Sequence, residues 1–118
     1  MYTHNAHFNN FITLLKTEKI HLNPALNLDI VADKLNISAN YLSQIINKNT
    51  GKTFCEIIGK LRVDEIKQML DNNQYEKYTL LSIGLEAGFN SKSVFYRTFK
   101  KFTRMTPSEY KEKLVYSM

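Results

Sequence analysis

The chain has 118 residues, of which 43% are hydrophobic, so it can bury one modest core or two small ones that share a helix. Its 16 lysine and arginine residues outnumber its 11 aspartate and glutamate residues, and the net charge of +5 favours a polyanionic partner. Cys55 is the single cysteine, which excludes an intramolecular disulfide and fits a reducing cytosol. No apolar run approaches the roughly 18 residues of a membrane span, so we expect a cytoplasmic chain that makes no membrane contact.

Apolar residues recur at helical rather than strand spacing along the whole chain, which predicts an all-α fold. Phe8 and Phe11 fall on one side of a helix expected over about residues 6–19. Pro24 then interrupts the pattern, because the residue before a proline avoids the α region. We therefore expect residues 1–26 to form an N-terminal helix and linker region.

Residues 27–53 have the pattern of a helix-turn-helix, in which two short helices are joined by a tight turn. The first helix is expected over about residues 28–35. After the turn, Ser38 can cap a second helix of about residues 39–49. Gly51 then stands where a glycine commonly ends a helix.

A long helix is expected next, because Thr53 and Glu56 form a capping box ahead of an apolar pattern that extends to Leu70. We assign residues 54–71 to this linker helix. Residues 79–115 then predict a second helix-turn-helix with a C-terminal helix. In this segment a short apolar helix precedes a basic helix that has an aromatic inner face.

The two helix-turn-helix segments read as copies of one unit. A cap serine followed four residues later by a large apolar residue occurs as Ser38 and Leu42, and again 53 residues on as Ser91 and Phe95. The helices before the turns align at a spacing of 52, so the second copy has one extra turn residue. A linker helix of about 17 residues is roughly 25 Å long, which suits two reading helices in successive major grooves about 34 Å apart.

The most specific motifs are Gly88-Phe89, Phe99-Lys100-Lys101 and Thr106-Pro107-Ser108-Glu109-Tyr110, with Tyr41-Leu42-Ser43 and Gly51-Lys52-Thr53-Phe54 in the first unit. Over about residues 28–113 the chain resembles the DNA-binding domain of the AraC/XylS family of bacterial transcription regulators. The resemblance implies seven helices, two helix-turn-helix units, double-stranded DNA as partner and a sensory domain commonly attached upstream, in a parent protein that is often membrane-anchored. We expect these seven helices plus an extra N-terminal helix.

Three positions depart from the family pattern, and one of them is Ile66 in the linker helix, where the family usually has alanine. Gly84 stands where the family usually has alanine, and its counterpart in the first unit is Ala32; both are small, which lets two helices cross closely. Arg104 stands where a glycine ends the second reading helix, as Gly51 ends the first. We expect Arg104 either to adopt a positive φ at a cost of about 1 kcal/mol, or to remodel the helix end. Both outcomes put a cation near the DNA backbone.

The outward faces of the two reading helices hold the candidate DNA contacts. The candidates for base contacts are Asn40, Ser43, Gln44 and Asn47 in the first unit and Lys92, Ser93, Tyr96 and Arg97 in the second. The candidates for phosphate contacts are Ser38, Thr53, Ser91, Lys100, Arg104 and Thr106. Arginine suits guanine, whereas asparagine and glutamine suit adenine, so we expect the first unit to discriminate sequence and the second to supply more of the affinity. The competing interpretation is a solvated basic face in the second unit and an ordinary polar surface in the first.

The sequence therefore predicts a sequence-specific, double-stranded DNA-binding domain. A non-specific nucleoid-type DNA binder and a protein-interaction module that docks RNA polymerase are the alternatives. No catalytic residues, cofactor or metal site are expected, since no acid or cysteine is placed to complete a site with His4, His7 or His21. Cys55 lacks a histidine partner nearby in sequence, so we interpret it as a half-buried structural thiol.

Overall fold

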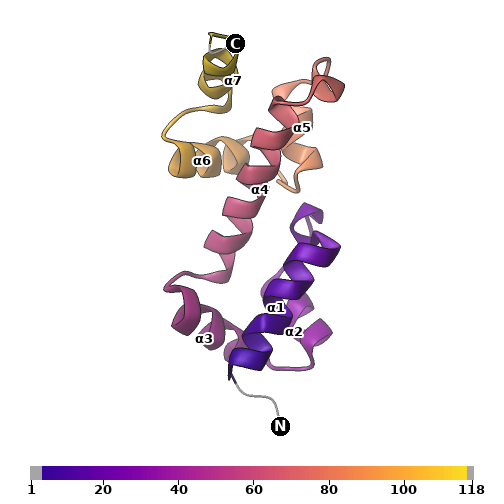
Figure 1. Ribbon diagram of the computed structural model, residues 1–118, viewed down its shortest axis with the longest axis vertical. Helices are drawn as coiled ribbons and strands as arrows, with labels where there is room; N and C mark the ends of the chain where they lie inside the picture. The colour runs from indigo at the N-terminus through magenta and orange to yellow at the C-terminus, as the bar shows by residue number, and fades with distance from the viewer. Residues whose placement is uncertain (1–3, 117–118) are drawn as a thin grey trace. The chain divides into compact units, whose positions relative to one another are not determined.

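The computed structural model describes residues 4–116, with the side chains of residues 6–115, and this described part is helical without strands (Figure 1). The α-helices are α1 (His4–Glu18), α2 (Leu28–Leu35), α3 (Ala39–Thr50), α4 (Phe54–Leu70), α5 (Leu80–Glu86), α6 (Lys92–Thr103) and α7 (Pro107–Tyr116), with single 3-10 turns η1 (Ile20–Leu22) and η2 (Asn73–Tyr75). The all-α class is confirmed. The N-terminal helix is the first of these seven, which corrects the expectation of an additional one; residues 1–3 of its region lie outside the described residues.

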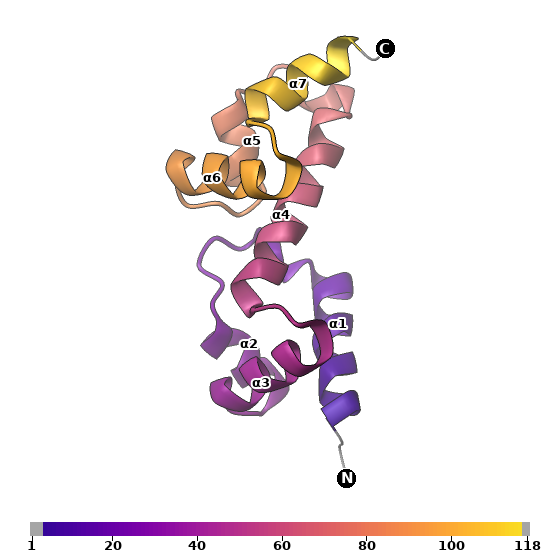
Figure 2. The same cartoon turned by 90° about the vertical axis from the view of Figure 1, so that its left-hand side faces the viewer.

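The chain forms two compact units that divide within α4, unit 1 ending at Ile58 and unit 2 beginning at Gly59. In unit 1, α1 packs on both α2 and α3, and these three helices lie together in both views (Figures 1 and 2). In unit 2, α6 packs on α5 and α7. Within residues 4–116, no helix has both the length and the apolar character that crossing a membrane requires.

Each unit has its own apolar core. In unit 1 the side chains of Phe11, Val31 and Leu42 are fully buried, and the rings of Phe11 and Phe54 lie 6.3 Å apart. Phe11 comes from α1, so the N-terminal helix completes the core of the first helix-turn-helix. Burial of each such side chain contributes about 1.5–3 kcal/mol.

The turns of the two helix-turn-helix units have the same backbone hydrogen bond. The N–H of Ile37 donates to the carbonyl of Ala32, and the N–H of Phe89 donates to the carbonyl of Gly84, each at 3.1 Å. These pairs are 52 residues apart, whereas the cap serines that follow are 53 apart. The predicted extra residue of the second turn is therefore Asn90, immediately after Phe89.

The close crossing predicted at Gly84 is present in unit 2. A Cβ atom added to Gly84 would lie only 2.4 Å from Cδ2 of Phe95, whose ring is fully buried and stacked on Phe89. The equivalent buried residues of unit 1 are Ala32 and Leu42. The second unit thus has a larger side chain on α6 and a smaller one on α5, which explains the departure from alanine.

Unit 2 also has a capping box at the start of α7. The N–H of Thr106 donates to Oε1 of Glu109 at 2.8 Å, and the N–H of Glu109 donates to Oγ1 of Thr106 at 3.1 Å. The hydrogen bond from the Thr106 backbone lowers the pKa of Glu109 most, the Thr106 side chain lowers it further, and Lys100 adds a favourable charge. The box therefore favours the ionised carboxylate.

Replacement of Gly84 by alanine is expected to destabilise unit 2, because overpacking against a buried ring costs about 1–3 kcal/mol and the gain in helix propensity offsets only about 1. The additional change Phe95→Leu makes room for the methyl group. Thermal unfolding of the two single variants and the double variant measures this coupling. Strictly additive losses in the double variant would show that the two side chains do not compete for space.

The capping box predicts a pH dependence. Because folding lowers the pKa of Glu109, its contribution to stability is complete above the pKa of the unfolded carboxyl and is lost as pH falls through the lower folded pKa. Denaturant unfolding between neutral and acidic pH should therefore show a shallower stability loss for Glu109→Gln than for the parent chain. An unchanged pH slope in Glu109→Gln would contradict this assignment.

Candidate nucleic-acid interface

The basic helix α6 has a buried aromatic face and an exposed cationic face. Phe95 and Phe99 are fully buried in the core of unit 2. Successive residues of an α-helix are rotated by about 100° about its axis, so Ser93, Arg97 and Lys100 project from the face opposite Phe95 and Phe99. All three side chains are exposed. Burial of the aromatic side chains thus determines which residues a partner of α6 can reach.

Arg104 ends α6 with a left-handed backbone at φ 66° and ψ 11°, and its N–H donates to the carbonyl of Lys100 at 2.8 Å. The first of the two predicted outcomes is confirmed: a non-glycine residue adopts the positive φ. Arg97, Lys100, Lys101 and Arg104 together line a surface hollow, which we call the α6 hollow. Arg104, the residue with the strained backbone, therefore contributes one of the four cations that line the α6 hollow.

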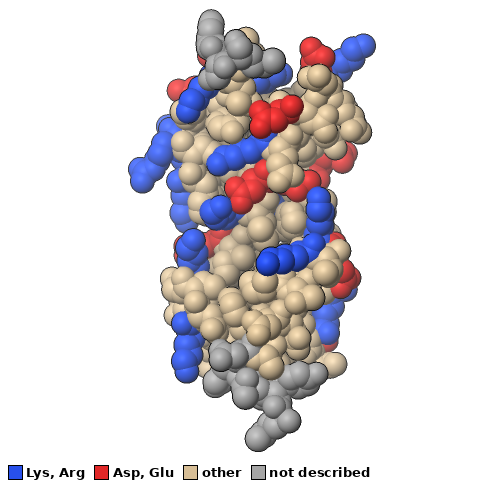
Figure 3. Space-filling view, viewed as in Figure 1, with Lys and Arg blue, Asp and Glu red and all other residues tan. Residues whose placement is uncertain are grey.

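Positive charge is concentrated at α6. The segment 91–105 contains five lysines and arginines and no acid, whereas the equivalent segment 38–52 contains two and no acid. In Figure 3 blue side chains gather along the left-hand edge beside the helix that Figure 1 labels α6. Unit 2 therefore has the stronger attraction for a polyanion.

The placement of Tyr96 on the outward face needs correction. Its ring is half-buried and meets the ring of Phe95 edge-on at 5.2 Å, so it belongs partly to the core of unit 2. Nζ of Lys92 lies 5.3 Å from the centroid of the same ring. Helical spacing alone missed this, because Tyr96 stands at the border between the two faces of α6.

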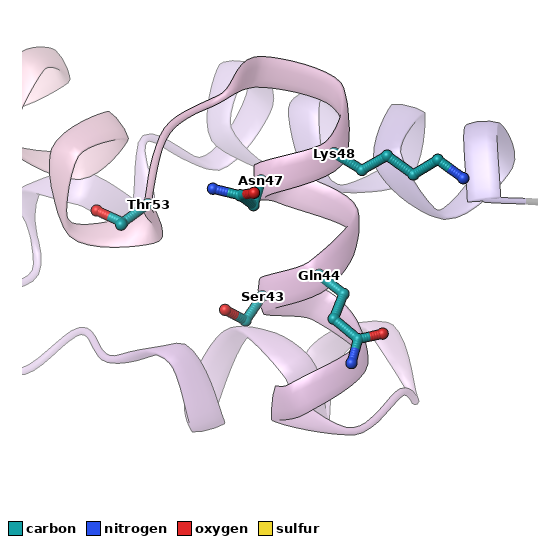
Figure 4. Close-up of a pocket in the computed structure, with 5 residues that line it drawn as sticks. All are labelled: Ser43, Gln44, Asn47, Lys48 and Thr53. Atoms are coloured by element: carbon teal, nitrogen blue, oxygen red, sulfur yellow. The ribbon is translucent and has the colours of Figure 1, made fainter.

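Unit 1 has a second hollow, the α3 hollow, lined by Ser43, Gln44, Asn47, Lys48 and Thr53. Asn47 reaches toward Thr53, which precedes α4, while Gln44 and Lys48 extend from another side of α3 (Figure 4). All five side chains are exposed. Amides and hydroxyls dominate this lining, so it can both donate and accept hydrogen bonds.

The two hollows occupy equivalent positions. Gln44, Asn47 and Lys48 in the α3 hollow correspond, 53 residues on, to Arg97, Lys100 and Lys101 in the α6 hollow. A duplicated backbone therefore presents two differently charged surfaces that share three equivalent lining positions.

Identical local hydrogen bonds support this equivalence. The hydroxyl of Thr50 donates to the carbonyl of Ile46 at 2.7 Å, and the hydroxyl of Thr103 donates to that of Phe99 at 2.8 Å. Each threonine oxygen also accepts from the backbone N–H two residues later. Gly51, with φ 70° and ψ 10°, matches the left-handed end of α6. The two reading helices thus end in the same geometry.

The four predicted contacts at helix starts are caps in the structure. Ser38 accepts from the N–H of Tyr41 at 3.1 Å, and Ser91 accepts from that of Val94 at 3.3 Å. Thr53 and Thr106 likewise accept from the N–H groups of residues 56 and 109. The role of these four residues as phosphate contacts stays a prediction. Asn40 is exposed in the first turn of α3, and its role as a base contact likewise stays a prediction.

Sequence reasoning missed Lys48 and Lys101, each of which lines a hollow. Their spacing of 53 residues is the signal that could have identified them. The prediction that Cys55 is half-buried was wrong, because its side chain is exposed. Among the described residues, no three His, Cys, Asp or Glu side chains gather in a way that could hold a metal ion.

Comparisons with known proteins agree with this geometry. The helix-turn-helix domain family matches residues 31–113. The melibiose operon regulatory protein of Escherichia coli K12 is 32% identical over 88 residues, which cover 75% of this chain and 28% of that protein. The chain thus spans little more than a quarter of that relative.

Solved structures share the fold. The C-terminal domain of the two-component response regulator yesN from Fusobacterium nucleatum superposes with a TM-score of 0.70 at 25% identity, covering 88% of this chain and 96% of that one. An AraC-type regulator from Chromobacterium violaceum gives a TM-score of 0.73 at 21% identity, covering 92% and 95%, and supports the fold alone. The chain belongs to the helix-turn-helix DNA-binding domains of the AraC/XylS family of transcription regulators.

Proposed function

We propose that both units of this chain read one DNA duplex, with α3 and α6 entering adjacent major grooves. The observation that carries the proposal is the repetition of the hollow, at positions 53 residues apart, on the exposed faces of α3 and α6. An α-helix fits the B-DNA major groove, where base edges differ in their hydrogen-bonding groups. Two equivalent surfaces in one chain support two base-reading contacts rather than one.

The charge difference supports different roles for the two units. The α6 hollow is lined by four cations, which suit phosphates and guanine acceptors, whereas the α3 hollow has Lys48 as its one cation among the lining residues. Release of counterions from DNA makes each phosphate contact sensitive to salt. We therefore expect most of the salt dependence of binding to come from unit 2.

We propose two further partners, the first of which the relatives support. The match to yesN lies in the C-terminal domain of a two-component response regulator, and the melibiose operon regulatory protein is much longer than this chain. We propose an upstream sensory domain as the partner that controls DNA binding, and RNA polymerase as the partner that DNA-bound chains recruit. Because bacterial DNA and RNA polymerase are in the cytoplasm, we propose the same location for the DNA-binding units.

The first test is selection of bound duplexes from a random library at about 0.15 M salt, a physiological ionic strength. We expect an enriched site with two blocks about 10 base pairs apart, because successive major grooves on one face recur once per DNA turn. One short block would show that only one unit reads sequence. Binding without enrichment would support a non-specific binder, and no binding would support a protein-interaction module.

Replacement of Arg104 by glycine should move stability and DNA affinity in opposite directions. Glycine relieves the left-handed strain, so we expect a gain of about 1 kcal/mol in the free energy of unfolding. Loss of one phosphate contact should weaken DNA binding and reduce the slope of log K against log salt by about 0.9. Denaturant unfolding and a salt titration of binding measure the two effects.

Gly51→Arg is the matched control, because Gly51 has the same backbone geometry and a Cβ there meets open space. It should lower stability by about 1 kcal/mol and steepen the salt dependence. If Arg104→Gly leaves both affinity and salt slope unchanged, Arg104 does not contact phosphate.

A further inference from the structure

The two hollows differ at two pairs of equivalent positions, Asn47 with Lys100 and Gln44 with Arg97, and in the second pair both side chains end in a planar hydrogen-bonding group. Gln44 and Arg97 both occupy the sixth residue of a 12-residue helix, and both side chains are exposed. The helices begin with serine caps and end in the same left-handed geometry. The backbone therefore presents Gln44 and Arg97 in the same way, and the difference between them lies in the side chain.

The neighbouring positions differ less in what they can discriminate. Lys48 and Lys101 are lysines at equivalent positions, and both line their hollows. A lysine ammonium is a point charge on a flexible stem, which suits a phosphate at any sequence. These lysines are thus suited to the DNA backbone, whereas Gln44 and Arg97 have planar groups that can make two hydrogen bonds to one base edge.

The side chains of Gln44 and Arg97 match different purines. A glutamine amide has a donor beside an acceptor, which pairs with N7 and the N6 amino group of adenine. An arginine fork has donors only, which pair with N7 and O6 of guanine. Each side chain leaves an unsatisfied group opposite the wrong purine, so each discriminates between them.

Resting on the proposed function, we propose that Gln44 and Arg97 are equivalent specificity-determining residues, Gln44 reading an adenine in one block of the site and Arg97 a guanine in the other. The two units then present their base-contacting side chains from the same backbone geometry. The residues at positions 44 and 97 set the base preference of each unit, so exchanging these residues exchanges the preferences.

The test is duplex selection with the parent chain, Gln44→Arg, Arg97→Gln and the double exchange. In Gln44→Arg we expect the adenine of one block to become guanine, with a change in relative affinity of at least about fivefold. In Arg97→Gln the guanine of the other block should become adenine. The double exchange should interchange the two preferences while keeping the spacing between the blocks.

Asn10→Arg is the control for added charge, because Asn10 is exposed on α1 and lines neither hollow. It should leave base preference unchanged, and circular dichroism should show all variants equally helical. Two enriched blocks in the parent with no change of base in either single variant would overturn this inference and leave the proposed function intact. No enrichment in the parent would overturn the proposed function itself.

Discussion

The fit of the Phe95 ring against the backbone of Gly84 determines how α6 lies on α5, and the exposed surface of unit 2 depends on it. Phe95 and Phe99 are fully buried, so the helical twist leaves Arg97, Lys100 and Arg104 on the side that faces solvent. A core contact thereby orients the charged residues. Unit 1 reaches the same arrangement with a different pair of buried residues. Ala32 on α2 is larger than its equivalent Gly84, and Leu42 on α3 is smaller than its equivalent Phe95.

The same backbone frame carries two kinds of chemistry. The hydroxyls of Thr50 and Thr103 make the same bonds at the ends of α3 and α6, and the hollows lie at equivalent positions. The linings differ in charge, with amides and hydroxyls predominant in unit 1 and cations in unit 2. A duplicated scaffold can therefore divide sequence discrimination and electrostatic attraction between its copies, since base contacts specify and phosphate contacts position.

Arg104 shows how local strain and charge coincide at such a surface. The left-handed backbone that glycine adopts freely at position 51 is held by an arginine at position 104, with nearly the same φ and ψ. Such strain persists only where the surrounding structure enforces it. Here the hydrogen bonds of Thr103 and the Lys100 carbonyl hold the helix end, and the side chain of Arg104 joins the cations of the α6 hollow.

By itself the sequence determined the helical segments, their buried faces and the repeat, because periodicity and capping residues are local or repeated signals. Comparison with Gly51 identified Arg104 as the residue at the end of the second reading helix, and the structure decided between a positive φ and a remodelled end in favour of the positive φ. Tertiary structure decided what depends on neighbours from other elements. The α1 helix completes the core of unit 1, the ring of Tyr96 is held partly in a core, and Cys55 is left exposed. The repeat spacing of 53 residues could have singled out Lys48 and Lys101, but only the folded structure shows that each lines a hollow, since helical periodicity does not describe a concave surface.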